Sequence, residues 1–144
     1  MKRQAFIKAL SILPVALMQA CQKSFPSTPT IVTGKVIDEN NLPVEGVEFQ
    51  FSGIYKKGIS GGGSTFNLRT QSDKDGVYRF SQVIPDATDD ASIKVESNAK
   101  FDFNFKYQVL FFFNGKYDDT GSLIPVQQSA YGTTVTLNFQ IRKR

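Results

Sequence analysis

The sequence predicts an all-β protein, a seven-stranded antiparallel Greek-key sandwich, and three observations support this fold class. Beyond residue 30, apolar and polar residues alternate with a period of two, as in strands that bury one face. The same region has no segment with the period of about 3.6 residues that marks an amphipathic helix. The chain also has thirteen phenylalanines, large side chains suited to an apolar core. The alternating segments are residues 31–37, 45–51, 65–69, 77–80, 92–96, 107–113 and 133–141.

Residues 1–20 are predicted to be a signal peptide. Lys2, Arg3 and Lys8 give a basic start, and residues 9–18 form an apolar run that is long enough for a secretory signal but too short to span a bilayer. The following Leu-Met-Gln-Ala-Cys resembles the lipobox of bacterial lipoproteins. This resemblance implies that Cys21 is lipidated, becomes the mature N-terminus and anchors the protein to a membrane of the cell envelope, either the outer membrane or another periplasmic or surface-facing position.

The charge of the chain depends largely on that segment. Residues 1–20 hold three of the seventeen basic residues and none of the thirteen acidic ones, so fourteen basic and thirteen acidic residues remain after cleavage. A nearly neutral domain gives no reason to expect a nucleic-acid partner. Residues 21–30 are polar with two prolines and are predicted to be an extended, unpaired tether, which leaves residues 31–144 as one sandwich domain.

The alternation also predicts the core. Apolar residues at alternate positions of a strand share one face. Residues 45–51 should therefore pack against residues 77–80, and residues 133–141 should close the far side of the core. The predicted inward residues are Val47, Phe49, Phe51, Tyr78, Phe80, Val135, Leu137, Phe139 and Ile141.

An aromatic run occupies every second position from Phe101 to Phe113. A single strand of this length would exceed the usual range of about 3 to 10 residues, so we expect a break near residues 104–106. Two interpretations of the run stay open: a central buried strand, which we favour, or an aromatic surface that contacts a partner.

Residues 33–38, 42–49 and 70–80 carry a family resemblance. Thr-Gly-Lys-Val-Ile-Asp, then Leu-Pro-Val-Glu-Gly-Val-Glu-Phe, then Thr-Gln-Ser-Asp-Lys-Asp-Gly-Val-Tyr-Arg-Phe resemble carboxypeptidase regulatory-like domains, the transthyretin-like (prealbumin-like) β-sandwiches. The resemblance implies an accessory module of the kind found in peptidases, receptors and lipoproteins. It covers the first half of the domain, and the glycine-rich residues 56–64 are interpreted as an inserted, mobile loop.

The residue types exclude several chemistries. The chain has no histidine and one cysteine, so it lacks the parts of Ser-His-Asp or Cys-His catalysis and of ordinary zinc sites. The hydroxyisourate hydrolases and intradiol dioxygenases, which resemble the fold, depend on histidines. We therefore predict a protein that is not an enzyme and needs no cofactor.

The remaining candidates are binding residues. Asp86, Asp89 and Asp90 are weak calcium candidates, but solvated turn carboxylates are the default interpretation and no metal site is predicted. Beside the glycine run of residues 61–63, Tyr55, Lys56 and Lys57 form an aromatic and cationic group that suits contact with a ligand.

Three functions follow from these observations. The leading hypothesis is a non-catalytic envelope lipoprotein whose sandwich binds a protein partner. The first alternative is a module that binds glycans or other small ligands through Tyr55, Tyr117 and Tyr131. The second is a calcium-stabilised adhesion domain.

Overall fold

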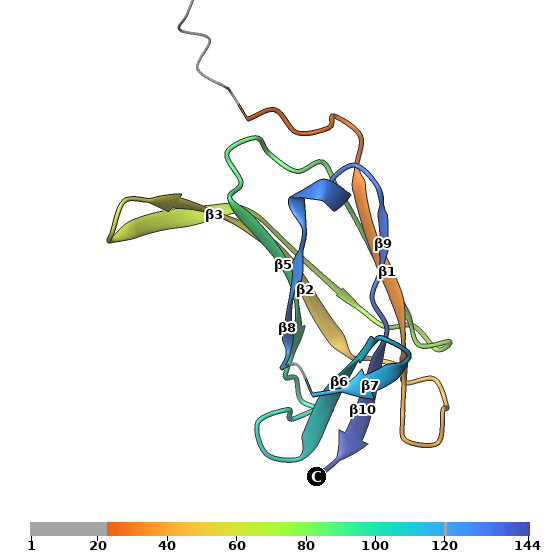
Figure 1. Cartoon of the computed structure of the whole chain (residues 1–144). Coiled ribbons are helices and arrows are strands. Elements are labelled where there is room, and N and C mark those ends of the chain that lie inside the picture. The colour runs from red at the N-terminus through yellow and green to blue at the C-terminus, as the bar shows by residue number, and fades with distance from the viewer. Residues whose placement is uncertain (1–22, 120) are drawn as a thin grey trace, which may run out of the picture.

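The computed structural model describes residues 23–119 and 121–144 of the chain, so the predicted signal peptide and Cys21 lie outside the described residues. The described part contains ten strands and one short 3-10 helix, arranged as two packed sheets (Figure 1). In chain order they are β1 (Thr30–Ile37), β2 (Glu48–Lys57), β3 (Gly61–Gln71), β4 (Val77–Gln82), β5 (Asp90–Glu96), β6 (Tyr107–Phe113), β7 (Lys116–Asp118), β8 (Leu123–Val126), η1 (Gln128–Ala130), β9 (Thr134–Thr136) and β10 (Phe139–Lys143).

The predicted β-sandwich is confirmed, but its seven-stranded antiparallel form is wrong. The larger sheet has the order β4-β1-β10-β6-β7, with β9 also pairing with β1, and the smaller sheet has the order β3-β2-β5-β8. Both β9 and β10 run parallel to β1, so the larger sheet is mixed. The described residues contain three strands more than predicted: β7, β8 and the second of two strands within residues 133–141.

The interruption between β9 and β10 has a local cause. The Leu137 amide donates to the Thr33 carbonyl at 2.8 Å, and the Lys35 amide donates to the side-chain Oδ1 of Asn138 at 2.9 Å. A side-chain oxygen therefore takes a place that a backbone carbonyl would hold in a regular ladder. Gly34 lies between these two contacts, where a Cβ atom would come within 1.8 Å of the Leu137 oxygen.

The strands that sequence analysis missed are short. β7 has three residues and β8 has four, too few for an alternating pattern to stand out. Asn114 and Gly115 both have positive φ, 51° and 83°, as the tight turn between β6 and β7 requires. Pro125 lies within β8, which is an edge strand, and edge strands tolerate a residue without an N–H.

The interpretation of residues 56–64 as a mobile loop is also wrong. β2 and β3 continue their antiparallel pairing through Tyr55↔Gly63 and Lys57↔Gly61, after a register shift beside Gly53. The paired strands form a long hairpin that projects sideways from the sandwich (Figure 1). Gly63 has a packing role, because a Cβ at this position would lie 2.6 Å from the ring of Tyr55.

The aromatic run breaks where expected. Residues 103–106 form a turn, and β6 begins at Tyr107. Phe101 is buried, whereas Phe105 is 81% exposed and Phe113 is 54% exposed. The run is therefore part core and part surface, and neither single interpretation describes all of it.

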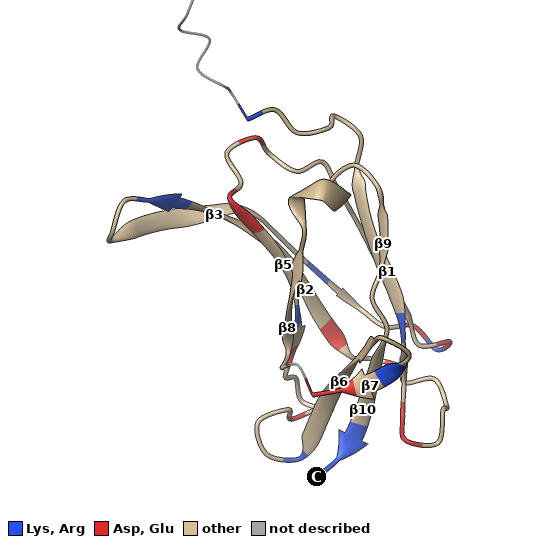
Figure 2. Cartoon of the chain, viewed as in Figure 1, with Lys and Arg blue, Asp and Glu red and all other residues tan. Residues whose placement is uncertain are grey.

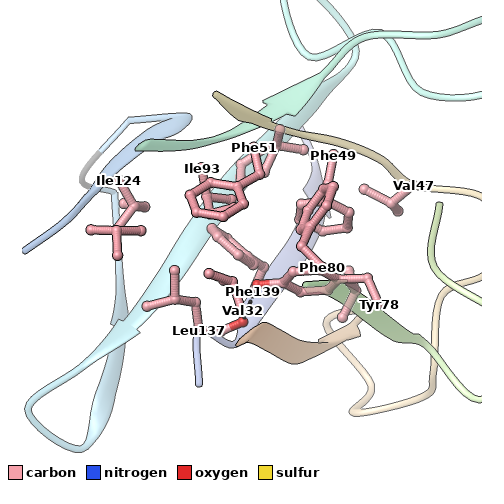
Figure 3. Close-up of a cluster of buried hydrophobic side chains, with 14 of the residues drawn as sticks. Val32, Val47, Phe49, Phe51, Tyr78, Phe80, Ile93, Ile124, Leu137 and Phe139 are labelled. Carbon is pink, nitrogen blue, oxygen red and sulfur yellow. Dashed lines mark hydrogen bonds between the residues drawn. The ribbon is translucent and has the colours of Figure 1, made fainter. Parts of the chain in front are cut away.

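The core lies between the two sheets (Figure 3). Phe49 of the smaller sheet stacks on Tyr78 of the larger sheet, with ring centroids 3.9 Å apart, and lies 5.4 Å from the ring of Phe139. The Tyr78 hydroxyl donates to the Leu137 carbonyl at 2.7 Å, so its polar atom is satisfied inside the core. Of the predicted inward residues, Val135 is partly buried and the others are buried.

Candidate binding site at the tether end of the sandwich

Residues 23–29, within the segment predicted to be a tether, lie against the domain. The Phe25 amide donates to Asp86 Oδ1 at 2.7 Å, and the Phe25 ring packs edge-on against Tyr131 with centroids 4.8 Å apart. Lys23 Nζ donates to the Thr88 carbonyl at 3.0 Å. Residues 23–29 form no strand, and the Phe25 ring among the polar residues gives this segment an apolar contact with the domain.

Asp89 connects this docked segment to the β2–β3 hairpin. Its Oδ2 accepts the Lys56 amide at 2.7 Å, its Oδ1 lies 3.6 Å from Lys23 Nζ, and its own amide donates to the Ile54 carbonyl at 2.8 Å. The hydrogen bond from the Lys56 amide is the main cause that lowers the pKa of the Asp89 carboxyl. Asp90 pairs with the Lys56 ammonium and raises the pKa of that lysine.

A groove crosses the outer face of the smaller sheet beside these residues. Ser52 of β2 pairs with Ser92 of β5, and Ser92 pairs with Pro125 of β8. Residues paired across strands lie on the same face, so three short side chains form a row at right angles to the strands.

Longer side chains flank this row on both sides. Ile54 and Asp90 pair on one side, and Lys94 and Leu123 pair on the other. Gln127 and Gln128 add amide groups at the end of β8, and the groove has a volume of about 790 Å³. Its surface therefore offers apolar contacts from Ile54 and Leu123 together with hydroxyl and amide groups.

Tyr131 lies under the tether end of this groove. Its side chain is 3% exposed, and its hydroxyl has no hydrogen-bond partner among the described residues. Burial, and then the charge of Asp90, raise the pKa of Tyr131. This tyrosine cannot present an exposed ring to a sugar.

The three tyrosines proposed to read a glycan do not share a surface. Tyr55 lies on the projecting hairpin and is 39% exposed. Tyr117 lies in β7, near the opposite end of the sandwich from the tether (Figure 1), where its ring packs against Phe112 at 5.0 Å. The structure brings Lys56, Asp89, Asp90 and Tyr131 around one groove and leaves Tyr117 apart.

The calcium candidates contact donors from the chain itself. Asp86 accepts from Phe25, while Asp89 and Asp90 contact lysines. Within residues 23–119 and 121–144, no group of three or more His, Cys, Asp or Glu side chains could hold a metal ion. In the same part of the chain, no helix has the length and hydropathy needed to cross a membrane.

A second groove, of about 300 Å³, lies at the end of the domain near the C-terminus. Its polar groups largely pair with one another or with the backbone: Gln108 Nε2 donates to Asp119 Oδ2 at 2.8 Å, and Arg144 Nε donates to the Tyr107 carbonyl at 3.1 Å.

Sequence analysis missed the groove residues Ser52, Ser92 and Pro125. No local pattern singles them out, because two serines and a proline are ordinary on the solvent face of a strand. They become a row only through the register of β2, β5 and β8, and β8 itself was not predicted. The acidic residues Asp86, Asp89 and Asp90 and the group of Tyr55, Lys56 and Lys57, in contrast, were found from their positions in the sequence.

Comparison with known proteins gives no family. No family model matches the chain, and no curated protein matches it. Among solved structures, the chain is similar to BcpA, the major pilin subunit of Bacillus cereus, at 17% identity over 81% of this chain and 31% of that one, with a TM-score of 0.41. A streptococcal ancillary pilin gives 17% identity over 81% and 33%, with a TM-score of 0.43. The plantain pollen allergen Pla l 1 gives 15% identity over 81% and 95%, with a TM-score of 0.42.

The chain thus spans about a third of the two pilins that it matches. At these identities and TM-scores the likenesses assign no function, and the carboxypeptidase regulatory-like resemblance stays a prediction. The chain's own strand pairing identifies it as a two-sheet β-sandwich of mixed strand direction.

Proposed function

We propose that this chain is a non-catalytic domain of a bacterial cell envelope, anchored to a membrane through lipidated Cys21, that binds a protein partner. The observation that carries the proposal is the groove across β2, β5 and β8. It combines a row of short side chains with apolar and polar flanks, and grooves of this size with convergent polar groups are the usual binding sites of small domains.

A protein segment suits the groove better than a sugar. Sugar sites commonly present a flat aromatic face, whereas the aromatic residue at this groove, Tyr131, is buried beneath it. An extended segment can instead place its side chains on Ile54 and Leu123, which are 44% and 56% exposed. Its amide groups can bond to Ser52 and Ser92. β8 pairs on one side only, so it also offers an edge for strand addition.

The carboxylates at the groove favour binding over catalysis. Asp89 accepts a backbone amide and lies near Lys23, and Asp90 pairs with Lys56. A general acid or base must be free to exchange a proton with a substrate. Carboxylates held as charge partners in this way are better suited to positioning the hairpin and the tether.

The proposal is tested by crosslinking in the producing cell. A photo-crosslinking amino acid replaces Ser92 in the groove or, as a control, Arg79 on the exposed face of β4. We expect an adduct with one protein at position 92 and none at position 79. The purified adduct partner should then bind the wild-type domain, and Ser52→Trp, which fills the groove, should weaken binding at least tenfold.

Equal binding of that partner to wild type and Ser52→Trp would refute the groove as its site. Anchoring is tested separately with Cys21→Ser, which should move the protein out of the membrane fraction. If Cys21→Ser stays in that fraction, the anchor is not on Cys21. A turnover activity that depends on a residue of the domain would refute the non-catalytic assignment.

A further inference from the structure

The distal half of the β2–β3 hairpin is unusual in what it exposes. Ile59 at its tip is fully exposed, at 107% of the reference value, and Ile54 and Tyr55 nearer the sandwich are 44% and 39% exposed. Gly58, with a φ of 61°, has no atom within 4 Å of the position its Cβ would take. The tip therefore presents an aliphatic side chain to the surroundings with nothing from its own domain beside it.

The distal half of the hairpin also carries basic but no acidic side chains. Lys56 and Lys57 lie in this half, and residues 54–68 contain no Asp or Glu. The Lys56 ammonium pairs with Asp90 of the sandwich, and Lys57 is exposed. Figure 2 shows the basic residues on the projecting strands and the nearest acidic ones in the sandwich. An aliphatic tip, a neighbouring tyrosine and lysines are the residue types that favour the interface of an anionic bilayer.

The docked tether places the proposed anchor at the same end of the molecule. Lys23 is held by the Thr88 carbonyl and lies 3.6 Å from Asp89, and Asp89 accepts the amide of Lys56 in the hairpin. Cys21 is two residues from Lys23, and two residues span at most about 7 Å. A lipid on Cys21 would therefore bring the membrane surface close to the 86–90 loop and the base of the hairpin.

We propose that the tip of the β2–β3 hairpin is a second membrane contact, in which Ile59 enters the lipid interface while Lys57 faces phospholipid headgroups. The inference rests on the proposed anchoring through Cys21. Once one point is anchored, a weak second contact acts at high effective concentration, so a single aliphatic residue with one neighbouring lysine is sufficient. The two contacts together fix the orientation of the sandwich on the membrane.

The chain has no tryptophan, so Ile59→Trp supplies a unique fluorescent reporter at the tip. The matched control is Leu42→Trp, which replaces an aliphatic residue that is 58% exposed in the loop after β1, at the end of that strand away from the tether. The protein isolated from cell membranes is placed in vesicles of phosphatidylethanolamine and phosphatidylglycerol with brominated acyl chains. We expect the indole of Ile59→Trp to shift its emission to the blue and to be quenched several-fold more strongly than the indole of Leu42→Trp.

The charge contribution is tested by adding Lys57→Glu to the Ile59→Trp protein, which should reduce the quenching at least twofold while the melting temperature stays unchanged. Equal quenching of the Ile59→Trp and Leu42→Trp proteins in their anchored form would overturn the proposal. A blue shift that depends on protein concentration and needs no vesicles would also overturn it, because a second copy would then cover the tip.

Failure of the anchor gives a different result. If the wild-type protein is absent from cell membranes, the proposed anchoring fails. The hairpin is then tested in unlipidated Ile59→Trp protein whose Cys21 is coupled to a maleimide phospholipid. Quenching of the tip reporter in that form supports a membrane-binding hairpin, and its absence refutes one.

Discussion

At the scale of single residues, Gly34 shows how closely β1 approaches the segment between β9 and β10. A Cβ at this position would lie 1.8 Å from the Leu137 carbonyl oxygen and 3.0 Å from the ring of Tyr78. The first of these neighbours is backbone and cannot rotate away. Gly34 is needed for this close approach rather than for an unusual backbone conformation.

Gly34→Ala should therefore lower the free energy of unfolding by more than about 3 kcal/mol, because the larger sheet must separate to admit one methyl group. Urea denaturation measures the change. Gly58→Ala is the control: its site is open but has positive φ, and its cost should be about 1 kcal/mol. A similar loss of unfolding free energy in both variants would show that the close approach of Gly34 to the Leu137 carbonyl does not cause the loss.

The raised pKa of Tyr78 makes the stability of the fold depend on pH. Burial raises the pKa of its phenol well above the ordinary range, whereas the tyrosine of the unfolded chain titrates near its ordinary pKa of about 10. The folded state thus retains a proton that the unfolded state releases. The stability this group contributes is complete below about pH 10 and falls as the pH rises towards the folded pKa, by about 1.4 kcal/mol for each pH unit.

Tyr78→Phe should lose about 1 to 3 kcal/mol at neutral pH, because the Leu137 carbonyl loses the phenol donor. It should also show a shallower decline in stability above pH 10. Urea denaturation at a series of pH values measures both effects. The pKa values of Tyr117 and Tyr131 are raised as well, so some decline remains in the variant; a decline as steep as that of wild type would contradict the assignment to Tyr78.

At the scale of elements, the docked tether behaves as part of the domain. Phe25 contacts Tyr131 through its ring and Asp86 through its amide, and Lys23 lies 4.9 Å from the centre of the Phe25 ring. These contacts cover a buried tyrosine that would otherwise meet water. The tether thus contributes to stability as well as to spacing.

Phe25→Ala should cost about 1 to 2 kcal/mol, from lost apolar burial and the lost edge-to-face contact, and should lower the melting temperature by about 5 °C. Ser27→Ala, at an exposed position of the same segment, should leave it unchanged. Calorimetry measures both, and limited proteolysis should cut residues 23–29 faster in Phe25→Ala. An unchanged melting temperature would mean that the tether adds no stability.

At the scale of the whole molecule, aromatic packing between the sheets is the main source of cohesion. A chain with a single cysteine cannot form an internal disulfide, and Phe49 joins the sheets through Tyr78 and Phe139. Phe49→Ala should cost about 3 to 5 kcal/mol, a large part of the total of about 5 to 15 kcal/mol that is typical of a domain.

Phe105→Ala is the matched control, since it removes the same ring from a side chain that is 81% exposed. It should change the free energy of unfolding by less than about 0.5 kcal/mol. Urea denaturation of both variants separates core aromatics from surface ones. A large loss in Phe105→Ala would indicate that this ring is covered in solution.

Sequence analysis predicted the sandwich and most of its core because the period-two pattern records burial directly, as at Phe49, Phe51, Tyr78 and Phe80. It could not predict strand direction: the alternation in residues 133–141 is the same whether the segment runs parallel or antiparallel to β1. The mobile-loop interpretation was wrong because glycine was taken as a sign of flexibility, whereas Gly63 makes room for the ring of Tyr55. The groove depends on register between distant strands, which a single sequence does not record.

The central place of β10 in the larger sheet has a kinetic consequence. β10 lies between β1 and β6, so the sheet cannot close until residues 139–143 are available to pair with a strand that begins more than a hundred residues earlier. Contacts of such long sequence separation make folding slow, because the entropy of closing a long loop is lost before the contacts that stabilise the paired strands form. We therefore expect the larger sheet to close late in folding, and the domain to fold more slowly than one of the same size whose strands pair mainly with their neighbours in sequence.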